Sequence, residues 1–183
     1  QQTLRAAVWF CDVRGFTQLS ATLPRQELLD LLNDSFEEIV HGLHAHGGQV
    51  LKFMGDGLLA VFTGADEGAA CRSAAEAVTT VQRRLGELTE RRSKRGLTTA
   101  DVGIGLHFGD VTYGNIGAPA RLDFTVMGSA VNLAARVESL CGRLGVPVLG
   151  TEAFASRAKA GWTKQGEHPV KGVAEPVGVY QPS

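Results

Sequence analysis

Apolar residues in this chain fall into two patterns: short runs typical of strands, and longer stretches with helical spacing. The short runs predict strands at residues 4–11, 50–54, 58–62, 102–108, 111–117, 123–127, 146–149, 162–170 and 177–180. Apolar positions three or four apart predict long helices over about residues 24–46, 66–90 and 129–144, and a short one over 151–157. The order β-α-β-β-α-β predicts an α+β fold, a ferredoxin-like sandwich with additional C-terminal strands.

Residues that interrupt these patterns mark the ends of elements. Pro24 suits the first turn of a helix, and Asp66 can cap the next one. The basic run 91–96 contains no aromatic residue and little pattern, so we predict a solvated loop there. In the strand 102–108 the apolar side chains alternate with Gly103 and Gly105, which lets another backbone or a ligand come close.

Composition narrows the class of protein without defining its function. A chain of 183 residues with 44% hydrophobic and 20% charged residues suits one globular domain. A formal net charge of -1 gives no general argument for nucleic acid or for an anionic membrane as a partner. Cys11, Cys71 and Cys141 are odd in number and lie in apolar patterns, which predicts buried free thiols in a reducing compartment.

The chain carries no sign of a membrane segment or a signal peptide. No apolar run is long enough to span a bilayer, and the first residues lack basic and apolar regions. We therefore expect a cytoplasmic location and no direct membrane contact. Because the sequence starts without Met and a strand begins almost at once, we expect residues 1–183 to be a single domain excised from a longer protein with regulatory domains.

Two aspartates lie at the ends of apolar strands. Asp12 ends the first run, and Asp56 lies between Gly55 and Gly57, which would supply the positive φ of a tight hairpin turn. A strand-helix-strand crossover would place both strands in one sheet, and adjacent carboxylates favour Mg²⁺ or Mn²⁺ between them. Each aspartate alone is explained as well by a local turn or strand-end role, so only the pair argues for a site.

Glycine after the first aspartate adds an anion-binding feature. Gly15 has no side chain to cover the backbone amides around it, and bare amides can face an anion. Carboxylates, divalent metals and free amides together suggest a triphosphate ligand.

Three segments resemble the class III nucleotide cyclases. They are residues 10–17 (FCDVRGFT), 52–57 (KFMGDG) and 124–136 (FTVMGSAVNLAAR). They occur in the order and spacing of that family, and the similarity extends from about residue 4 to residue 180. Three spaced motifs are much more specific than any one of them.

The resemblance implies the metal and phosphate ligands. Two divalent cations would be held by Asp12, Asp56 and the carbonyl of Val13. The β- and γ-phosphates would meet the backbone amides of Gly15, Phe16 and Thr17. The family forms dimers whose active sites are shared between protomers, so the resemblance also implies a homodimer.

The resemblance further implies residues for the base, the ribose and the reacting phosphate. Lys52 and Thr125 match the pair that reads the purine. Asn132 and Arg136 match the residues that orient the ribose and stabilise the transition state, and Lys171 matches a lysine that contacts the triphosphate. The guanidinium of Arg136 suits this role, because it offers several donors to phosphoryl oxygens as charge moves onto them.

The residues at the base positions favour ATP. A lysine can donate to purine N1 and a threonine hydroxyl can accept from a 6-amino group, which together describe adenine. Guanylate-forming relatives place Glu and Cys at these positions. The commonest adenylate pattern has Asp at the Thr125 position, and Asp123 lies two residues away on the same strand face, so either residue can be the acceptor.

The sequence thus predicts an adenylate cyclase that converts ATP to 3′,5′-cyclic AMP and pyrophosphate, with no nucleic-acid partner. Two alternatives remain open: a guanylate cyclase, and a catalytically silent nucleotide-binding or dimerisation module. The silent module would be signalled by loss of Asp12, Asp56, Asn132 or Arg136, and all four are present. A diguanylate cyclase or a polymerase palm shares the sandwich but does not call for a helix with Asn132 and Arg136.

Overall fold

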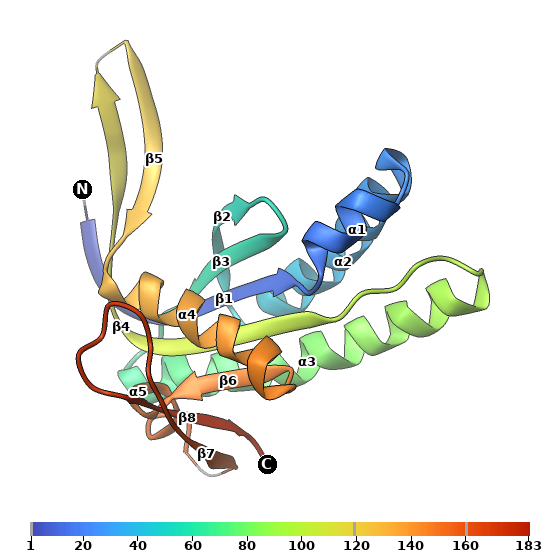
Figure 1. The fold of residues 1–183 in the computed structure, drawn as a ribbon. Helices are drawn as coiled ribbons and strands as arrows, with labels where there is room; N and C mark the ends of the chain where they lie inside the picture. The colour runs from blue at the N-terminus through green and yellow to red at the C-terminus, as the bar shows by residue number, and fades with distance from the viewer. Residues whose placement is uncertain (1, 119, 160) are drawn as a thin grey trace.

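The computed structural model describes residues 2–118, 120–159 and 161–183, and side chains in these ranges except those of 116–118 and 121–125. Figure 1 shows the arrangement of the elements. The strands are β1 (Gln2–Val13), β2 (Gln49–Met54), β3 (Gly57–Phe62), β4 (Val102–Ala118), β5 (Arg121–Met127), β6 (Val148–Thr151), β7 (Trp162–His168) and β8 (Val177–Pro182). The helices are α1 (Phe16–Thr22), α2 (Arg25–Ala45), α3 (Glu67–Lys94), α4 (Ser129–Leu144) and α5 (Glu152–Ala155).

One mixed sheet organises the described residues. Its strand order is β2-β3-β1-β4-β6-β8-β7, and β5 pairs with β4 outside this path. The first part, β1-α2-β2-β3-α3-β4, gives the order 2-3-1-4 with antiparallel neighbours, which is the ferredoxin-like arrangement. The α+β class, the sandwich and the additional C-terminal strands are confirmed.

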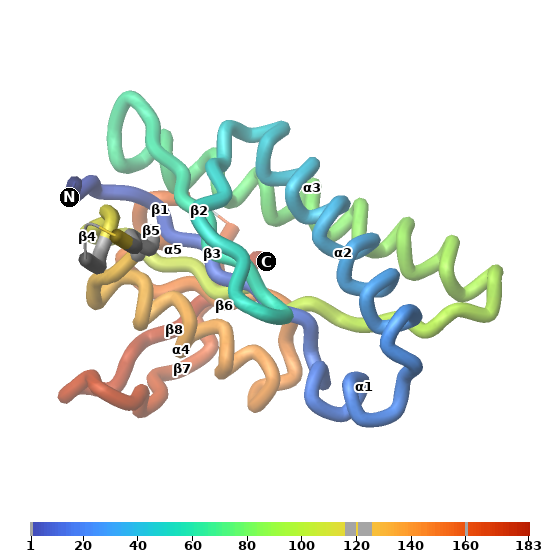
Figure 2. The backbone as a smooth tube through the Cα atoms, turned by 90° about the horizontal axis from the view of Figure 1, so that it is seen from above, coloured from blue at the N-terminus to red at the C-terminus, as the bar shows by residue number. Residues whose placement is uncertain are grey.

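Helices cover both faces of the sheet. In Figure 2, α2 and α3 lie on one side of the strands and α4 lies on the other. Each face of the sheet packs against its helices through a hydrophobic core. Strand β1, in the middle of the sheet, contributes side chains to both cores, because successive side chains of a strand point to opposite faces. Ala7, Trp9 and Cys11 are buried in the cluster that includes residues of α2 and α3, whereas Ala6 and Val8 belong to the cluster that includes residues of α4.

Strand β4 is longer than predicted. The two strands expected at residues 102–108 and 111–117 form one continuous strand. Its first part lies between β1 and β6, and its second part pairs with β5 as a two-stranded arm that projects from the body of the molecule (Figure 1).

The predicted loop at residues 91–96 is wrong over its first part, because α3 continues to Lys94. Arg92 is only 5% exposed, which is unusual for an arginine. Its Nη1 is 2.5 Å from Oδ2 of Asp34 and its Nε donates to the carbonyl of Thr98 at 2.8 Å. These partners hold the basic turn in the helix, and the apolar pattern does not reveal Asp34, which is 58 positions away in the sequence.

Other local predictions are confirmed with small shifts. The side chain of Asp66 accepts from the amide of Ala69 at 2.7 Å and caps α3, while Pro24 is the N-cap of α2 instead of its first residue. Helix α1 was not predicted. The three cysteines are free and buried, as expected. Among the described residues, no helix has both the length and the apolar character needed to cross a bilayer.

Candidate active site

Asp12 and Asp56 lie side by side, and we call this pair the carboxylate edge. Strand β1 runs antiparallel to β3 with Asp12 opposite Gly57, the residue after Asp56. The amide of Val13 donates to the carbonyl of Asp56 at 3.0 Å. The crossover helix leads to β2 at the edge of the sheet, so it is β3, and not β2, that is the neighbour of β1.

The two glycines around Asp56 serve different purposes. Gly55 has φ of 64°, a left-handed conformation that favours glycine and makes the turn. Gly57 does not have a positive φ. A Cβ there would lie 2.5 Å from the carbonyl oxygen of Cys11 and 3.0 Å from Cβ of Asp12. The second glycine therefore lets the hairpin approach Asp12, a role that the turn prediction did not include.

The electrostatics of the carboxylate edge suit divalent cations. Burial raises the pKa of Asp56, the adjacent Asp12 raises it further, and a backbone hydrogen bond acts in the opposite direction. Among the described residues, no group of three or more His, Cys, Asp or Glu side chains is placed to hold a metal ion. Mg²⁺ in proteins is usually held by one or two carboxylates together with substrate phosphates, and this pair fits that pattern.

Glu138 of α4 lies beside the carboxylate edge, and sequence reasoning missed it. It is 5% exposed and hydrogen-bonds with Asp12. Burial, and then the contact with Asp12, raises the pKa of its carboxyl group to about 9. One signal was available: an acidic residue lies between Val137 and Leu140 on the apolar side of its helix.

Two glycines of β4 make room for Glu138. A Cβ on Gly103 would lie 2.5 Å from Oε1 of Glu138, and one on Gly105 would lie 2.5 Å from its backbone nitrogen. The prediction that bare glycines allow another backbone to come close is confirmed, and the backbone is that of α4. This close packing sets the distance between α4 and β4, the strand in which Gly103 lies opposite Asp12 of β1.

The residues expected to meet phosphates lie at the start of α1. Gly15 has φ of 67° and is the N-cap of this short helix, without a side-chain hydrogen bond to the cap. The first amides of a helix have no partner within it, so the amides of Phe16 and Thr17 are suitable donors. Their contact with phosphate stays a prediction.

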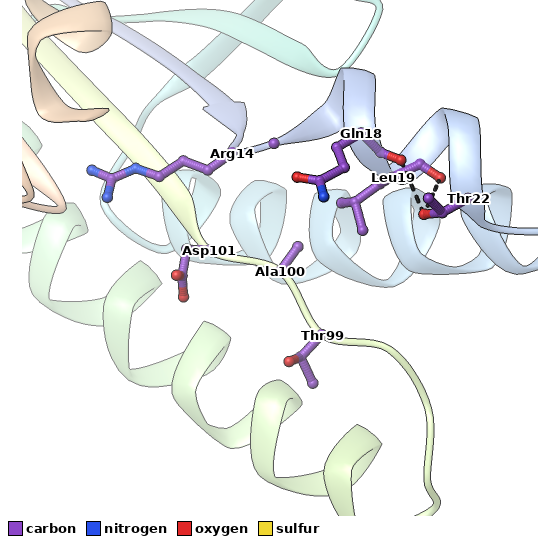
Figure 3. Close-up of a pocket in the computed structure, with 8 residues that line it drawn as sticks. Arg14, Gln18, Leu19, Thr22, Thr99, Ala100 and Asp101 are labelled. Carbon is purple, nitrogen blue, oxygen red and sulfur yellow. Dashed lines mark hydrogen bonds between the residues drawn. The ribbon is translucent and has the colours of Figure 1, made fainter. Parts of the chain in front are cut away.

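A cavity of about 330 Å³ lies next to this loop, lined in part by Gln18, Thr22 and Asp101 (Figure 3). The side chain of Arg14 extends away from Gln18 and Thr22. Its guanidinium donates to the carbonyl of Val146, and its Nε is buried without a hydrogen-bond partner among the described residues. In this conformation Arg14 is not directed at the phosphate loop.

Asn132 and Arg136 project from α4 on the face that is not packed on the sheet. Asn132 is exposed and Arg136 is partly exposed, whereas Ala134 and Val137 between and after them are buried. Arg136 and Lys171 line one cavity of about 160 Å³, together with Arg143. We call these three residues the cationic cavity.

The purine-reading residues are placed only in part. Lys52 is exposed on β2, next to a register shift. Thr125 lies opposite Gly114 in the pairing of β4 and β5. The side chains of Thr125 and Asp123 lie outside the described part of the structure, so the identity of the acceptor stays a prediction.

Within the described part of a single chain, the carboxylate edge and the cationic cavity are not linked to each other. Among the described residues, no hydrogen bond or ion pair links Arg136 or Lys171 to Asp12 or Asp56. The carboxylate edge belongs to strands in the middle of the sheet, and the cationic cavity lies between α4 and the segment after β7.

Comparisons with known proteins agree with the motifs. The profile of the adenylate and guanylate cyclase catalytic domain matches residues 1–181. An adenylate cyclase from Anabaena cylindrica is 36% identical over 155 residues, which are 82% of this chain and 30% of that protein. The crystal structure of the adenylyl cyclase CyaB from P. aeruginosa superimposes with a TM-score of 0.85 at 30% identity, covering 100% of this chain and 96% of that one. The guanylyl cyclase Cya2 gives a TM-score of 0.84 at 28% identity, covering 98% and 91% of the two chains.

Proposed function

The chain belongs to the family of adenylate and guanylate cyclase catalytic domains, and on that basis we propose that it converts ATP to 3′,5′-cyclic AMP and pyrophosphate. The observation that supports this most directly is the carboxylate edge. Two aspartates 44 positions apart in sequence are brought together by the register of β1 and β3. The similarity to an adenylate cyclase over 82% of the chain supports the same activity.

Each half of the site has its own task in the reaction. Asp12, Asp56 and the carbonyl of Val13 would hold two divalent cations, Mg²⁺ or Mn²⁺, which lower the pKa of the ribose 3′-OH and neutralise the leaving pyrophosphate. Arg136 would donate to the phosphoryl oxygens as negative charge develops on them. Asn132, one helical turn earlier, would orient the ribose.

A homodimer would bring the two halves together. We propose that Asp12 and Asp56 of one protomer face Lys52, Thr125, Asn132, Arg136 and Lys171 of the other. A two-fold dimer has an isologous interface and would therefore contain two equivalent sites. The separation of opposite charges within one chain supports this arrangement, and the projecting β4–β5 arm offers surface for it.

The preference for ATP over GTP is a separate part of the proposal. It depends on Lys52 and on Thr125 or Asp123, as donor and acceptor for adenine. The similarity to the guanylyl cyclase Cya2 keeps GTP as a second candidate substrate.

We also propose that this domain works within a longer, regulated protein. The chain spans 30% of the length of the Anabaena relative and 33% of a mycobacterial one. The buried free thiols suit a reducing compartment such as the cytoplasm.

One experiment tests the activity. The protein is incubated with Mn²⁺ and, separately, with ATP and GTP, and the products are identified by mass spectrometry. We expect cyclic AMP and pyrophosphate in equal amounts from ATP, and a much slower reaction with GTP. Faster formation of cyclic GMP would reverse the base assignment, and no product from either nucleotide would favour a silent module.

A further inference from the structure

We propose that Arg143 is a third cation of the triphosphate site, and that it retains the polyphosphate both in the substrate and in the pyrophosphate product. This inference deepens the proposed function and rests on it. Neither the motifs nor the family resemblance assigns a role to Arg143.

Helix geometry places Arg143 with the two other cations. Arg143 follows Arg136 by seven positions, which is close to two helical turns, so both project from the same face of α4. Ser139 and Leu140 lie between them and also line the cavity. Its volume of about 160 Å³ is about that of five water molecules in the liquid, enough for a phosphate-sized group.

The side of the cavity formed by residues 169–171, opposite α4, is held in place by a buried residue. Val170 is 8% exposed and belongs to a core cluster that includes Val137, Leu140 and Val179. The amide of Val173 donates to the carbonyl of Val170 at 3.1 Å.

Gly172 completes this turn with φ of 85°, as glycine does at the third position of a type II turn. Lys171, at the second position, is therefore held next to α4 by the anchoring of the residue before it. The cavity is preorganised by apolar packing and does not depend on an ion pair to form.

Within the described part of the chain, the two arginines and the lysine of this cavity have no carboxylate partner, unlike most of the other arginines. Among the described residues, Arg5, Arg84, Arg92 and Arg157 each form an ion pair with a carboxylate. In the same described part of the chain, Arg136, Arg143 and Lys171 form no ion pair and no side-chain hydrogen bond.

The nearest acidic residue along α4, Glu138, is buried and directed toward Gly103 of the sheet. Three positive charges that share a small cavity repel one another unless an anion binds between them. A multivalent phosphate matches both the charge and the size of this space.

Arg143 also lies in the last turn of α4, where a cation stabilises a helix through its dipole. That structural role would affect stability without affecting ligand binding. An experiment that separates the two compares Arg143→Ala and Arg143→Lys with the control Arg83→Ala. Arg83 is an exposed arginine of α3, on the opposite side of the sheet, and its loss changes the net charge equally.

The probe is inorganic tripolyphosphate, whose binding to the intact domain is measured by calorimetry without nucleotide. We expect Arg143→Ala to weaken this binding about three- to fivefold, the upper part of the range for one exposed charge pair, and Arg143→Lys to restore part of it. In the cyclase assay, KM for ATP and the inhibition constant of pyrophosphate should rise by the same factor, with a smaller effect on kcat. Arg83→Ala should leave all three quantities near the wild-type values.

Two results would overturn the proposal. If Arg83→Ala weakens tripolyphosphate binding as much as Arg143→Ala does, only the net charge matters. If Arg143→Ala lowers the melting temperature but leaves tripolyphosphate binding and KM unchanged, the residue only stabilises the helix end. A wild-type protein that makes no cyclic nucleotide, but whose tripolyphosphate binding depends on Arg143, would refute the proposed function and leave the anion site standing.

Discussion

The carboxylate edge and the cationic cavity are built by different means. Asp12 and Asp56 are set by the register between two central strands, with a backbone hydrogen bond of 3.0 Å beside them. Arg136, Arg143 and Lys171 come from one helix and one turn, and are set by apolar packing of Val170 beneath them. The first is part of the sheet, whereas the second lies on its surface.

This difference explains why a single chain carries two unbalanced charge clusters. Oppositely charged groups within reach of each other would pair and neutralise the site before any ligand arrived. Keeping them on separate surfaces leaves the carboxylates available for cations and the basic residues available for phosphate. A second protomer and a nucleotide would then complete both clusters at once.

The largest effect should come from removing one carboxylate. Asp12→Asn and Asp56→Asn keep the size of the side chain but remove a metal ligand and its charge. We expect turnover at modest Mn²⁺ concentration to fall by at least about 100-fold. Initial rates of cyclic AMP formation measure this, with circular dichroism to verify folding. Activity near the wild-type level in either variant would refute the two-metal assignment.

The proposed sharing of each site between two protomers predicts complementation. Asp12→Ala and Arg136→Ala should each be nearly inactive, because every site of either homodimer lacks one essential group. In an equal, exchanging mixture half the dimers are heterodimers, and each has one intact site of two. Activity should therefore return to about a quarter of the wild-type level. A mixture that stays inactive, while light scattering and subunit labels show mixed dimers, would place both residues in one protomer's site.

The base-reading residues give a smaller effect. Lys52→Glu with Thr125→Cys removes the donor to N1 and the acceptor from the 6-amino group. Because each lost hydrogen bond costs about 1–3 kcal/mol, we expect the ratio of rates with ATP and GTP to fall by at least about 10-fold. Competition assays with both nucleotides measure the ratio. An unchanged ratio would direct attention to Asp123→Ala as the next variant.

The smallest effect concerns the pH dependence of stability at the carboxylate edge. Because burial raises the pKa of Glu138 to about 9, the folded protein keeps a proton that the unfolded chain loses near pH 4.5. Without divalent ions, the free energy of unfolding should therefore fall as pH rises from 4.5 to 9, because over this range the folded state binds one proton more than the unfolded state. Urea titrations across this range measure the slope.

Glu138→Gln should flatten that slope, and Glu90→Gln, an exposed residue of α3, should not. The same slope in wild type and Glu138→Gln would show that another group is responsible. Such a result would mean that Glu138 does not keep a proton beside the carboxylate edge in the folded protein.

Much of the molecule follows from local pattern. The spacing of apolar residues predicts the long helices and the hairpin at Asp56, because amphipathic periods of 3.6 and 2 reflect burial on one face. The motifs around Asp12, Lys52 and Arg136 predict the chemistry, since they specify residue types at known spacing. Helix α1 escaped this reasoning, because its seven residues are too few for a periodic signal.

The sequence by itself determined most of the elements, the fold class and the two aspartates as a pair. Only the tertiary structure decided that β3 is the strand beside β1. It also decided that Glu138 lies against Gly103 and interacts with Asp12, and that Arg143 and Lys171 line the same cavity. The physical reason is range: periodicity records which face of an element is buried, but not what it is buried against. Arg143 and Lys171, 28 positions apart, line one cavity, and Asp12 and Glu138, 126 positions apart, interact, only once the strands have paired in their register.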